Sequence, residues 1–222
     1  MVSNDISPKC KTFVRLIIEW ETGIVRPFPW REKTTPYRVF VSEVLLKRTT
    51  SKAAVRIYNE FLSIYPDIKT LSQAETEEVL KLLKPIGLYR QRAHGLKQAA
   101  MIITIKHNGS FPNNLKDLLD IPHIGLYTAG AIMSLSYGIP APMLDSNAYR
   151  VISRAFNSFF GNSPKFSGVY IFLNSIIPKG SIKHFNWGLI DLGATICTPK
   201  RCFWELCPIY SICELKKKYT NG

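Results

Sequence analysis

The sequence predicts an all-α protein. Apolar residues recur every three or four positions along most of the chain, and no stretch of useful length alternates with the period of two that a β-strand requires. Pro85, Gly138 and Pro140 interrupt this pattern. With 222 residues, of which 46% are hydrophobic, the chain is large enough to bury a core in one or two domains.

Each expected helix has one apolar face. Phe13 and Ile17 mark the first such face, and Ser72 with Glu75 fits a capping box before a later helix. One expected helix starts at about residue 37. The other segments with helical spacing are 10–20, 54–65, 79–83, 92–105, 115–119, 128–135, 147–156, 170–177 and 185–194.

The chain is strongly basic. It has 29 Lys and Arg against 16 Asp and Glu, a net charge of +13. A surplus of this size usually indicates a polyanionic partner, most often nucleic acid, although a solvated basic surface is the simpler alternative. The positive residues are dispersed among apolar segments, which favours a basic face on a folded domain over a disordered arm.

The sequence gives no sign of membrane insertion or secretion. No stretch approaches the ~18 consecutive apolar residues of a membrane span. The first residues, MVSNDISPKCK, lack the apolar run of a secretory signal. We therefore expect an intracellular protein without a membrane partner, either cytoplasmic and associated with the nucleoid or elsewhere inside the cell. We also expect it to be a monomer.

Four of the five cysteines lie close together, in ICTPKRCFWELCPIYSIC. In an intracellular protein such a cluster favours a metal site over disulfides. The spacing is C-x4-C-x4-C-x5-C, made by Cys197, Cys202, Cys207 and Cys213. The fifth, Cys10, has no partner pattern and is expected to be buried on the first helix.

The segment IPHIGLYTAGAI indicates a sharp turn between two helices, through Pro122, His123, Ile124 and Gly125. Such a turn directs backbone N–H groups and a helix N-terminus outwards, and they bind a phosphate without reading base sequence. An ordinary helix–helix connection is the alternative.

These motifs together resemble a known family. DIPHIGLYTA, then LDSNAYRVISR, then four cysteines are similar to the helix-hairpin-helix DNA glycosylases, in the iron–sulfur branch that includes endonuclease III and the adenine glycosylase. PWR, PYRVFVSEVLLKRTT and FNWGLIDLGATIC extend the resemblance over about 30–213. LLKRTT and Tyr127 favour the archaeal-type mismatch glycosylases, which remove thymine or uracil opposite guanine. The family usually has glycine where His123 stands; histidine adopts a positive φ more readily than bulky residues do, so the hairpin is expected to form.

The resemblance implies two helical domains. A six-helix barrel containing the helix-hairpin-helix is expected over 29–138. A second helical domain, with the four-cysteine loop, is expected to combine 1–28 and 139–222.

Asp145 matches the catalytic aspartate of the family. Breaking an N-glycosidic bond leaves positive charge on the sugar and negative charge on the departing base. The resemblance implies that the Asp145 carboxylate stabilises the sugar cation and helps water attack. Asp before Ser-Asn-Ala is also a good helix N-cap, and the two roles are compatible.

Tyr127 separates branches of the family. Relatives that also cut the strand have lysine at this position, because an amine must form a Schiff base with the sugar. A phenol cannot, so we expect a monofunctional enzyme without strong lyase activity; a half-buried core aromatic is the alternative. The resemblance implies that Glu43 contacts or protonates the flipped base, with a surface charge as its alternative.

The resemblance also implies a DNA interface. Arg48 and Thr49 correspond to a minor-groove wedge, and Leu88 and Tyr89 to a loop that probes the opposite strand. The charged side chains of Lys47, Arg90 and Arg92 could instead be solvated, and Trp187 could lie in the core. The full set is Lys47, Arg48, Thr49, Leu88, Tyr89, Arg90, Arg92, His123, Ile124, Gly125 and Trp187.

The cysteine pattern of the family is C-x6-C-x2-C-x5-C, so Cys202 is displaced and Trp204 stands at the expected second position. We expect a structural [4Fe–4S] cluster with Cys202 as the shifted ligand. A four-cysteine zinc site and a degraded site are the alternatives.

The predicted function is removal of thymine or uracil from mismatched double-stranded DNA. Adenine removal opposite guanine or 8-oxoguanine is the first alternative, but that branch tends to have glutamines where Lys47 and Arg48 stand and usually adds a C-terminal domain, whereas this chain ends nine residues after Cys213. A non-catalytic DNA-binding module is the second alternative. Retention of Glu43, Tyr127 and Asp145 together argues against it.

Overall fold

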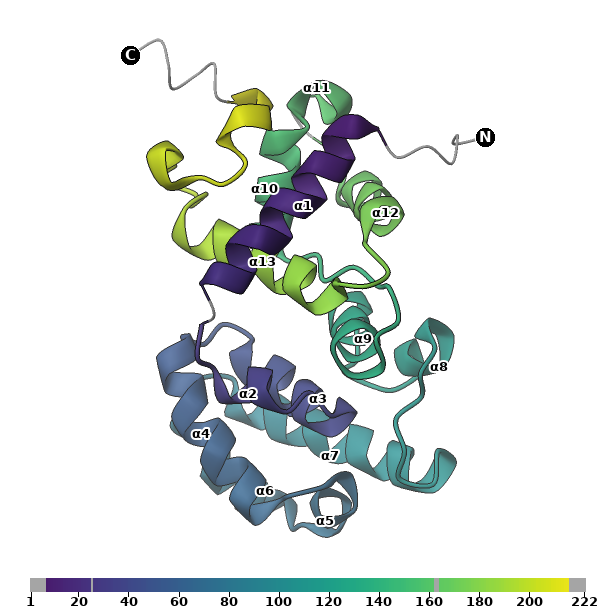
Figure 1. Ribbon diagram of the computed structural model, residues 1–222. Coiled ribbons are helices and arrows are strands. Elements are labelled where there is room, and N and C mark those ends of the chain that lie inside the picture. Colours follow the sequence, from purple (N-terminus) through teal and green to yellow (C-terminus); the bar gives the residue numbers. More distant parts are fainter. Residues whose placement is uncertain (1–6, 25, 162–163, 216–222) are drawn as a thin grey trace. The chain divides into compact units, whose positions relative to one another are not determined.

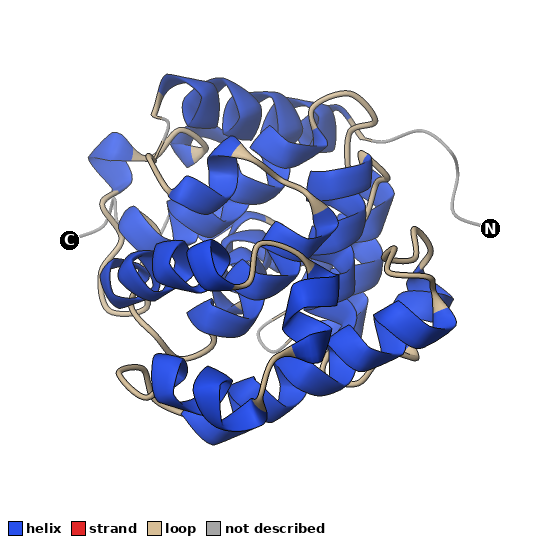
Figure 2. Ribbon diagram, turned by 90° about the horizontal axis from the view of Figure 1, so that it is seen from below, coloured by secondary structure: helices blue, strands red, loops and turns tan. Residues whose placement is uncertain are grey.

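The computed structural model describes residues 7–24, 26–161 and 164–215. All named elements in these ranges are helices or helical turns (Figure 2), which confirms the predicted all-α fold. The chain divides into two compact units: Pro27–Tyr137, here the hairpin unit, and Met1–Arg26 with Gly138–Gly222, here the cysteine unit. Within the described ranges, no helix is both long and apolar enough to cross a membrane.

The hairpin unit is built around its longest helix, α7, which packs against α3, α5 and α6. Small residues such as Ala93, Ala99 and Ala100 are completely buried on α7 and let its neighbours approach closely. The elements of this unit are α2 (Pro29–Glu32), α3 (Pro36–Leu46), α4 (Ser51–Ile64), α5 (Ile68–Gln73), α6 (Thr76–Leu83), α7 (Tyr89–Lys106), α8 (Leu115–Leu119), α9 (Leu126–Ala131) and the π-helical η1 (Ile132–Ser136).

Short polar side chains begin several helices of the hairpin unit. Thr50 caps α4 and accepts a hydrogen bond from the Ala53 N–H, and Asn114 caps α8 in the same way. The capping box predicted at Ser72 and Glu75 is wrong. Because α5 extends to Gln73, Ser72 lies inside that helix and its hydroxyl donates to the Lys69 carbonyl at 2.7 Å.

In the cysteine unit, α1 crosses α13, and α10 packs against α12 and α13 (Figure 1). Gly188 permits the first crossing, because a Cβ there would lie 2.7 Å from Ile17 Cγ2. Phe13 meets Phe156 edge to face at 5.1 Å in the core. The elements are α1 (Pro8–Gly23), α10 (Ser146–Ala155), α11 (Asn157–Phe160), α12 (Phe166–Ile176), α13 (Ile182–Thr195) and the 3₁₀ turns η2 (Trp204–Leu206) and η3 (Tyr210–Ile212).

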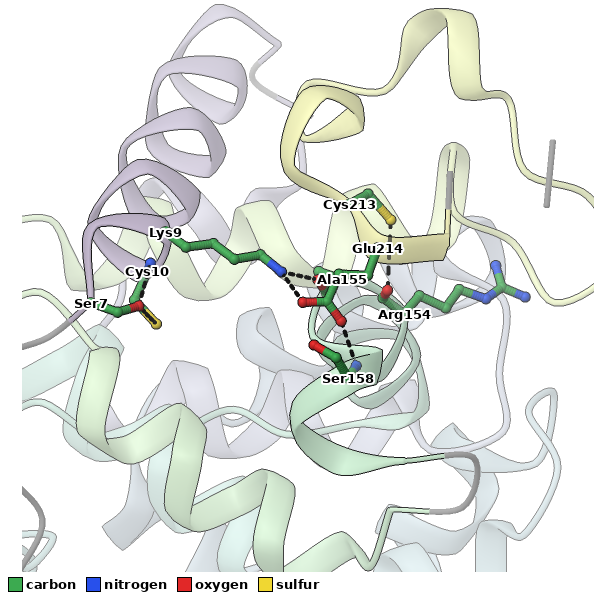
Figure 3. Close-up of polar contacts among 8 residues, drawn as sticks. All are labelled: Ser7, Lys9, Cys10, Arg154, Ala155, Ser158, Cys213 and Glu214. Atoms are coloured by element: carbon green, nitrogen blue, oxygen red, sulfur yellow. Dashed lines mark hydrogen bonds and ion pairs between the residues drawn. The ribbon is translucent and has the colours of Figure 1, made fainter. Parts of the chain in front are cut away.

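Polar contacts fasten the end of the cysteine loop to the rest of its unit (Figure 3). Glu214 pairs with Lys9 of α1 and accepts a hydrogen bond from the Ser158 N–H, while Lys9 also donates to the Ala155 carbonyl at 2.8 Å. The last described residues are therefore tied to two helices that begin far away in the sequence.

Cys10 is buried on α1, as predicted.

Candidate functional site

Asp145 caps the N-terminus of α10. Its Oδ1 accepts hydrogen bonds from the N–H groups of Asn147 at 2.9 Å and Ala148 at 2.8 Å, and its Oδ2 accepts one from the Asn147 side-chain amide at 2.9 Å. The carboxylate is half-buried. Three donors thus fix its orientation, and the predicted capping role is confirmed.

Two neighbours hold the start of α10 in place. A Cβ on Gly193 would lie 2.9 Å from the backbone of Asn147, so α13 approaches this turn as closely as only glycine allows. Arg150 donates to the Gly193 carbonyl at 2.6 Å, to the Asn147 side chain at 2.8 Å and to the Cys197 carbonyl at 2.7 Å. One guanidinium therefore connects the turn that carries Asp145 to the cysteine loop.

Tyr127 and Glu43 belong to two helices of the hairpin unit that pack against each other. Tyr127 is in the first turn of α9, and Glu43 is near the C-terminal end of α3; both are half-buried. The α3 helix contacts α9 and the following η1 turn. Trp187, on α13 of the cysteine unit, is also half-buried.

The turn between α8 and α9 has the expected hairpin shape. The Ile124 N–H donates to the Ile121 carbonyl at 3.2 Å, and both isoleucine side chains are buried. Gly125 precedes α9 and is exposed, and no side chain caps this end of the helix. His123 has φ 68°, which confirms the prediction that histidine accepts a positive φ here.

The His123 ring lies against α7. A Cβ on Gly95 would be 2.8 Å from the ring Cγ, and Nε2 of the ring lies 3.1 Å from Gln98 Oε1. The hairpin is thereby attached to the central helix of its unit by a side chain that a glycine at this position would lack. A phosphate contact by His123, which is exposed, stays a prediction.

Several residues predicted to touch DNA gather at one end of α7. Lys47 and Arg48, just after α3, and Leu88 and Arg90, at the start of α7, are exposed; Thr49 and Tyr89 are half-buried. Arg48 and Leu88 both have positive φ, 52° and 60°. A small cavity of about 90 Å³ is lined by Val44, Lys47, Leu88, Gln91, Arg92, Gly95 and His123.

Arg92 is buried, whereas the sequence predicted an exposed side chain that contacts DNA. It is only 4% exposed, and its guanidinium donates to the carbonyls of Val44, Leu45 and Lys47. A fourth bond goes to Thr49 Oγ1 at 2.7 Å. The predicted contact between Arg92 and DNA is therefore wrong, because these acceptors occupy the guanidinium.

Cys197 and Cys202 face each other across a tight hairpin. The Thr198 N–H donates to the Arg201 carbonyl and the Phe203 N–H to the Ile196 carbonyl, each at 3.1 Å. In this arrangement the two cysteines form a non-hydrogen-bonded antiparallel pair, whose side chains lie close together. The C-x4-C spacing thus has a structural basis: Cys202 approaches Cys197 directly.

The four cysteines of the loop form no disulfide, and their thiols influence one another. Burial raises the pKa of Cys207 to about 12, and Cys202, Cys213 and Cys197 add to the rise. Burial, followed by Cys197, also raises the pKa of Cys202. Arg154 Nη1 lies 3.3 Å from Cys197 Sγ.

Four thiols on one loop are the donor set that iron–sulfur clusters and structural zinc require, so the residues present fit such a group by their chemistry. In the part of the chain that the structure describes, no three His, Cys, Asp or Glu side chains are already arranged to hold an ion.

This chain is similar in sequence and in fold to known DNA glycosylases. A thymine/uracil-DNA glycosylase from Methanothermobacter thermautotrophicus is 35% identical over 96% of this chain and 97% of its own length. An adenine DNA glycosylase from Buchnera aphidicola is 33% identical over 93% of this chain but only 60% of its own length. The solved structure of a thermostable thymine-DNA glycosylase matches with a TM-score of 0.89 and 34% identity, covering 95% of this chain and 97% of that one.

The family model of the HhH-GPD superfamily matches residues 41–165, which include the hairpin and Asp145. The predicted family is thereby confirmed, and the relatives just described are hydrolases of N-glycosyl bonds. This chain belongs to the HhH-GPD superfamily of base excision DNA repair proteins.

Proposed function

We propose that this protein is a monofunctional DNA glycosylase that removes thymine or uracil mispaired with guanine and leaves an abasic site. The observation that carries the proposal is the Asp145 carboxylate, which three hydrogen bonds hold at the start of α10 within the LDSNAYR motif. The thymine/uracil relatives, which match over nearly their whole length, support the choice of base.

Asp145 would act on the sugar. As the bond to the base lengthens, positive charge builds on the sugar, and a fixed carboxylate stabilises it without having to reorganise. The same carboxylate orients the water that attacks the sugar. Because Asn147 and Ala148 already occupy part of its acceptor capacity, its direction is set before DNA binds.

Tyr127 and Glu43 would act in the hairpin unit. Glu43 contacts or protonates the departing base and so stabilises the negative charge that forms on it. Tyr127 offers a phenol where a lyase needs an amine, so no Schiff base forms and the strand stays intact. We expect the product to be an abasic site that requires alkali or another enzyme to be cut.

Mismatched double-stranded DNA is the proposed partner. The hairpin, with His123, Ile124 and Gly125, binds phosphate, while Arg48 and Thr49 enter the duplex as the base leaves. Eversion costs less at a mismatch than at a matched pair, which supplies part of the selectivity. The other proposed contacts are Lys47, Leu88, Tyr89, Arg90 and Trp187.

Excision on defined duplexes tests this function. The protein is incubated with duplexes carrying G·T, G·U, A·8-oxoguanine or matched pairs, and strands are then examined with and without alkali. We expect cutting of G·T and G·U only, and only after alkali. Cutting confined to adenine-containing mismatches would instead support the adenine activity that the Buchnera relative suggests. No cutting of any duplex would favour a non-catalytic DNA-binding module.

We also propose that Cys197, Cys202, Cys207 and Cys213 hold a [4Fe–4S] cluster, as endonuclease III-like proteins typically do. When bound, such a group would fasten the loop as a structural support. The bridge between Cys197 and Cys202 supports the assignment of the displaced cysteine as a ligand, since it brings the two thiols together.

Colour and metal content test this assignment. Protein purified without oxygen should be brown and contain iron; colourless protein with one zinc per chain would support the zinc alternative. Cys202→Ser should lower the iron content, whereas Cys10→Ala, which removes a buried thiol outside the loop, should leave it unchanged. Equal iron in both variants would exclude Cys202 as a ligand.

A further inference from the structure

Arg92 is a buried cation that binds the end of another helix. The last carbonyls of an α-helix have no partners within that helix. At the end of α3, two of them, Val44 and Leu45, accept hydrogen bonds from Nη1 of Arg92. A guanidinium suits this task because its N–H groups spread in a fixed plane and reach several acceptors at once.

The same guanidinium continues beyond α3 into segment 47–49. Its Nη2 donates to the Lys47 carbonyl and to Thr49 Oγ1. Between these two attachment points lies Arg48, an exposed residue with φ 52°. A non-glycine residue stays in this conformation only where its surroundings hold it there. Arg92 supplies an attachment on each side of Arg48.

Lys97, on the same helix, performs a similar task elsewhere. It is 9% exposed, and its Nζ donates to the carbonyls of Leu71 at 3.1 Å, Ser72 at 2.9 Å and Ala74. These carbonyls belong to the end of α5, where none of the proposed DNA contacts lies. Burial lowers the pKa of both Arg92 and Lys97. The two cations thus differ mainly in which segment they hold.

We propose that Arg92 is a positioning residue for base eversion: it holds segment 47–49 in the shape with which Arg48 and Thr49 enter the duplex. This rests on the proposed function, in which those two residues form the wedge. Arg92 touches neither the substrate nor the reacting atoms. Its effect is carried by the carbonyls of α3 and Lys47 and by the Thr49 hydroxyl.

Matched substitutions test the proposal in the full-length protein. Arg92→Met and Lys97→Met each remove one buried cation from α7 and leave a side chain of similar length, so both should lower the melting temperature. Only Arg92→Met should also slow single-turnover uracil excision from a G·U duplex, by ~10- to 100-fold, the size expected when a reacting group is slightly misplaced. Arg92→Lys should lie between wild type and Arg92→Met, since a lysine reaches fewer of the acceptors.

A second readout separates positioning from general damage. A 2-aminopurine placed beside the target base reports eversion, and Arg92→Met should weaken this signal while Lys97→Met preserves it. The rate deficit of Arg92→Met should shrink when the uracil is unpaired in a bulge, where eversion costs less. Wild-type rates for Arg92→Met, or equal deficits for the two methionine variants at matched folded fraction, would overturn the inference.

If Arg92→Met does not fold, the Arg92→Lys variant tests the proposal instead. A folded Arg92→Lys variant with wild-type excision and eversion would refute the positioning role. An inactive wild-type protein would refute the proposed function instead, so the two failures are distinguishable.

Discussion

The two units hold their functional segments by different means. In the hairpin unit, segment 47–49 and the hairpin turn are attached to α7 by protein side chains alone, through Arg92 and His123. In the cysteine unit, Arg150 and Arg154 bind carbonyls at the start of the cysteine loop, and Glu214 fastens its end. Between these fixed ends lie the four cysteines, none of which forms a disulfide. The hairpin unit is thus held by contacts among its own residues, whereas the proposed metal group would add a further link within the cysteine loop.

Removing charge from the cysteine unit should give the largest effect. Asp145→Asn keeps a good N-cap but loses the carboxylate, so base release should fall by ~10²- to 10³-fold while folding and duplex binding persist. Asp145→Ala should lose the activity and also about 1 kcal/mol of stability, because the cap disappears. Single-turnover excision and thermal unfolding measure the two effects. An active Asp145→Asn variant would remove the catalytic role and leave only the cap.

The corresponding change in the hairpin unit should add an activity. Tyr127→Lys places an amine in the first turn of α9, so we expect a Schiff base with the sugar and some strand cleavage without alkali. Borohydride reduction should trap a covalent protein–DNA adduct in Tyr127→Lys and none in wild type or Tyr127→Phe. Absence of an adduct in the lysine variant would count against placing Tyr127 near the sugar.

Replacing one glycine in each unit with alanine compares how rigidly the two units are packed. Alanine in a helix interior usually gains ~1 kcal/mol over glycine. A Cβ on Gly193 meets the Asn147 backbone at 2.9 Å, and such overpacking costs ~1–3 kcal/mol. The three atoms nearest to a Cβ on Gly95 belong to the exposed His123 side chain, which yields more readily than backbone does. In denaturant unfolding, Gly193→Ala should therefore be destabilising and Gly95→Ala nearly neutral.

A double variant sharpens this comparison. His123→Gly removes the ring and the non-glycine φ, so Gly95→Ala should become stabilising in that background. If Gly95→Ala cost as much as Gly193→Ala, the hairpin turn would be as rigidly packed as the start of α10.

The smallest expected effect concerns the fastening of the cysteine loop. The Lys9–Glu214 pair is partly buried, with side-chain exposures of 29% and 28%, and a double-mutant cycle should give a coupling of ~0.5–1 kcal/mol. The exposed Arg15–Glu19 pair on α1 is the control and should couple by no more than ~0.5 kcal/mol. Equal coupling in both cycles would show that the tie of the loop end to α1 contributes no more than an exposed ion pair.

Much of the fold could be predicted because its helices repeat apolar residues at helical spacing, and Asp145 could be recognised as a cap from its neighbours alone. Arg92 could not be interpreted correctly, because arginine is usually exposed and its acceptors lie 43 to 48 positions earlier in the chain. The same limit applies to Lys97, which the sequence analysis missed. The capping-box prediction at Ser72 was wrong because the sequence pattern does not show that the preceding helix, α5, already includes Ser72. For Cys202, the spacing showed a displacement but not the hairpin that brings it to Cys197.

The contact between His123 and Gly95 also has an evolutionary consequence. Residues that touch tend to vary together, and here the dependence has a direction. A side chain larger than alanine at position 95 would collide with the His123 ring, so a lineage with histidine in the turn needs a small residue on α7. Relatives that have the histidine should therefore have glycine or alanine at the α7 position.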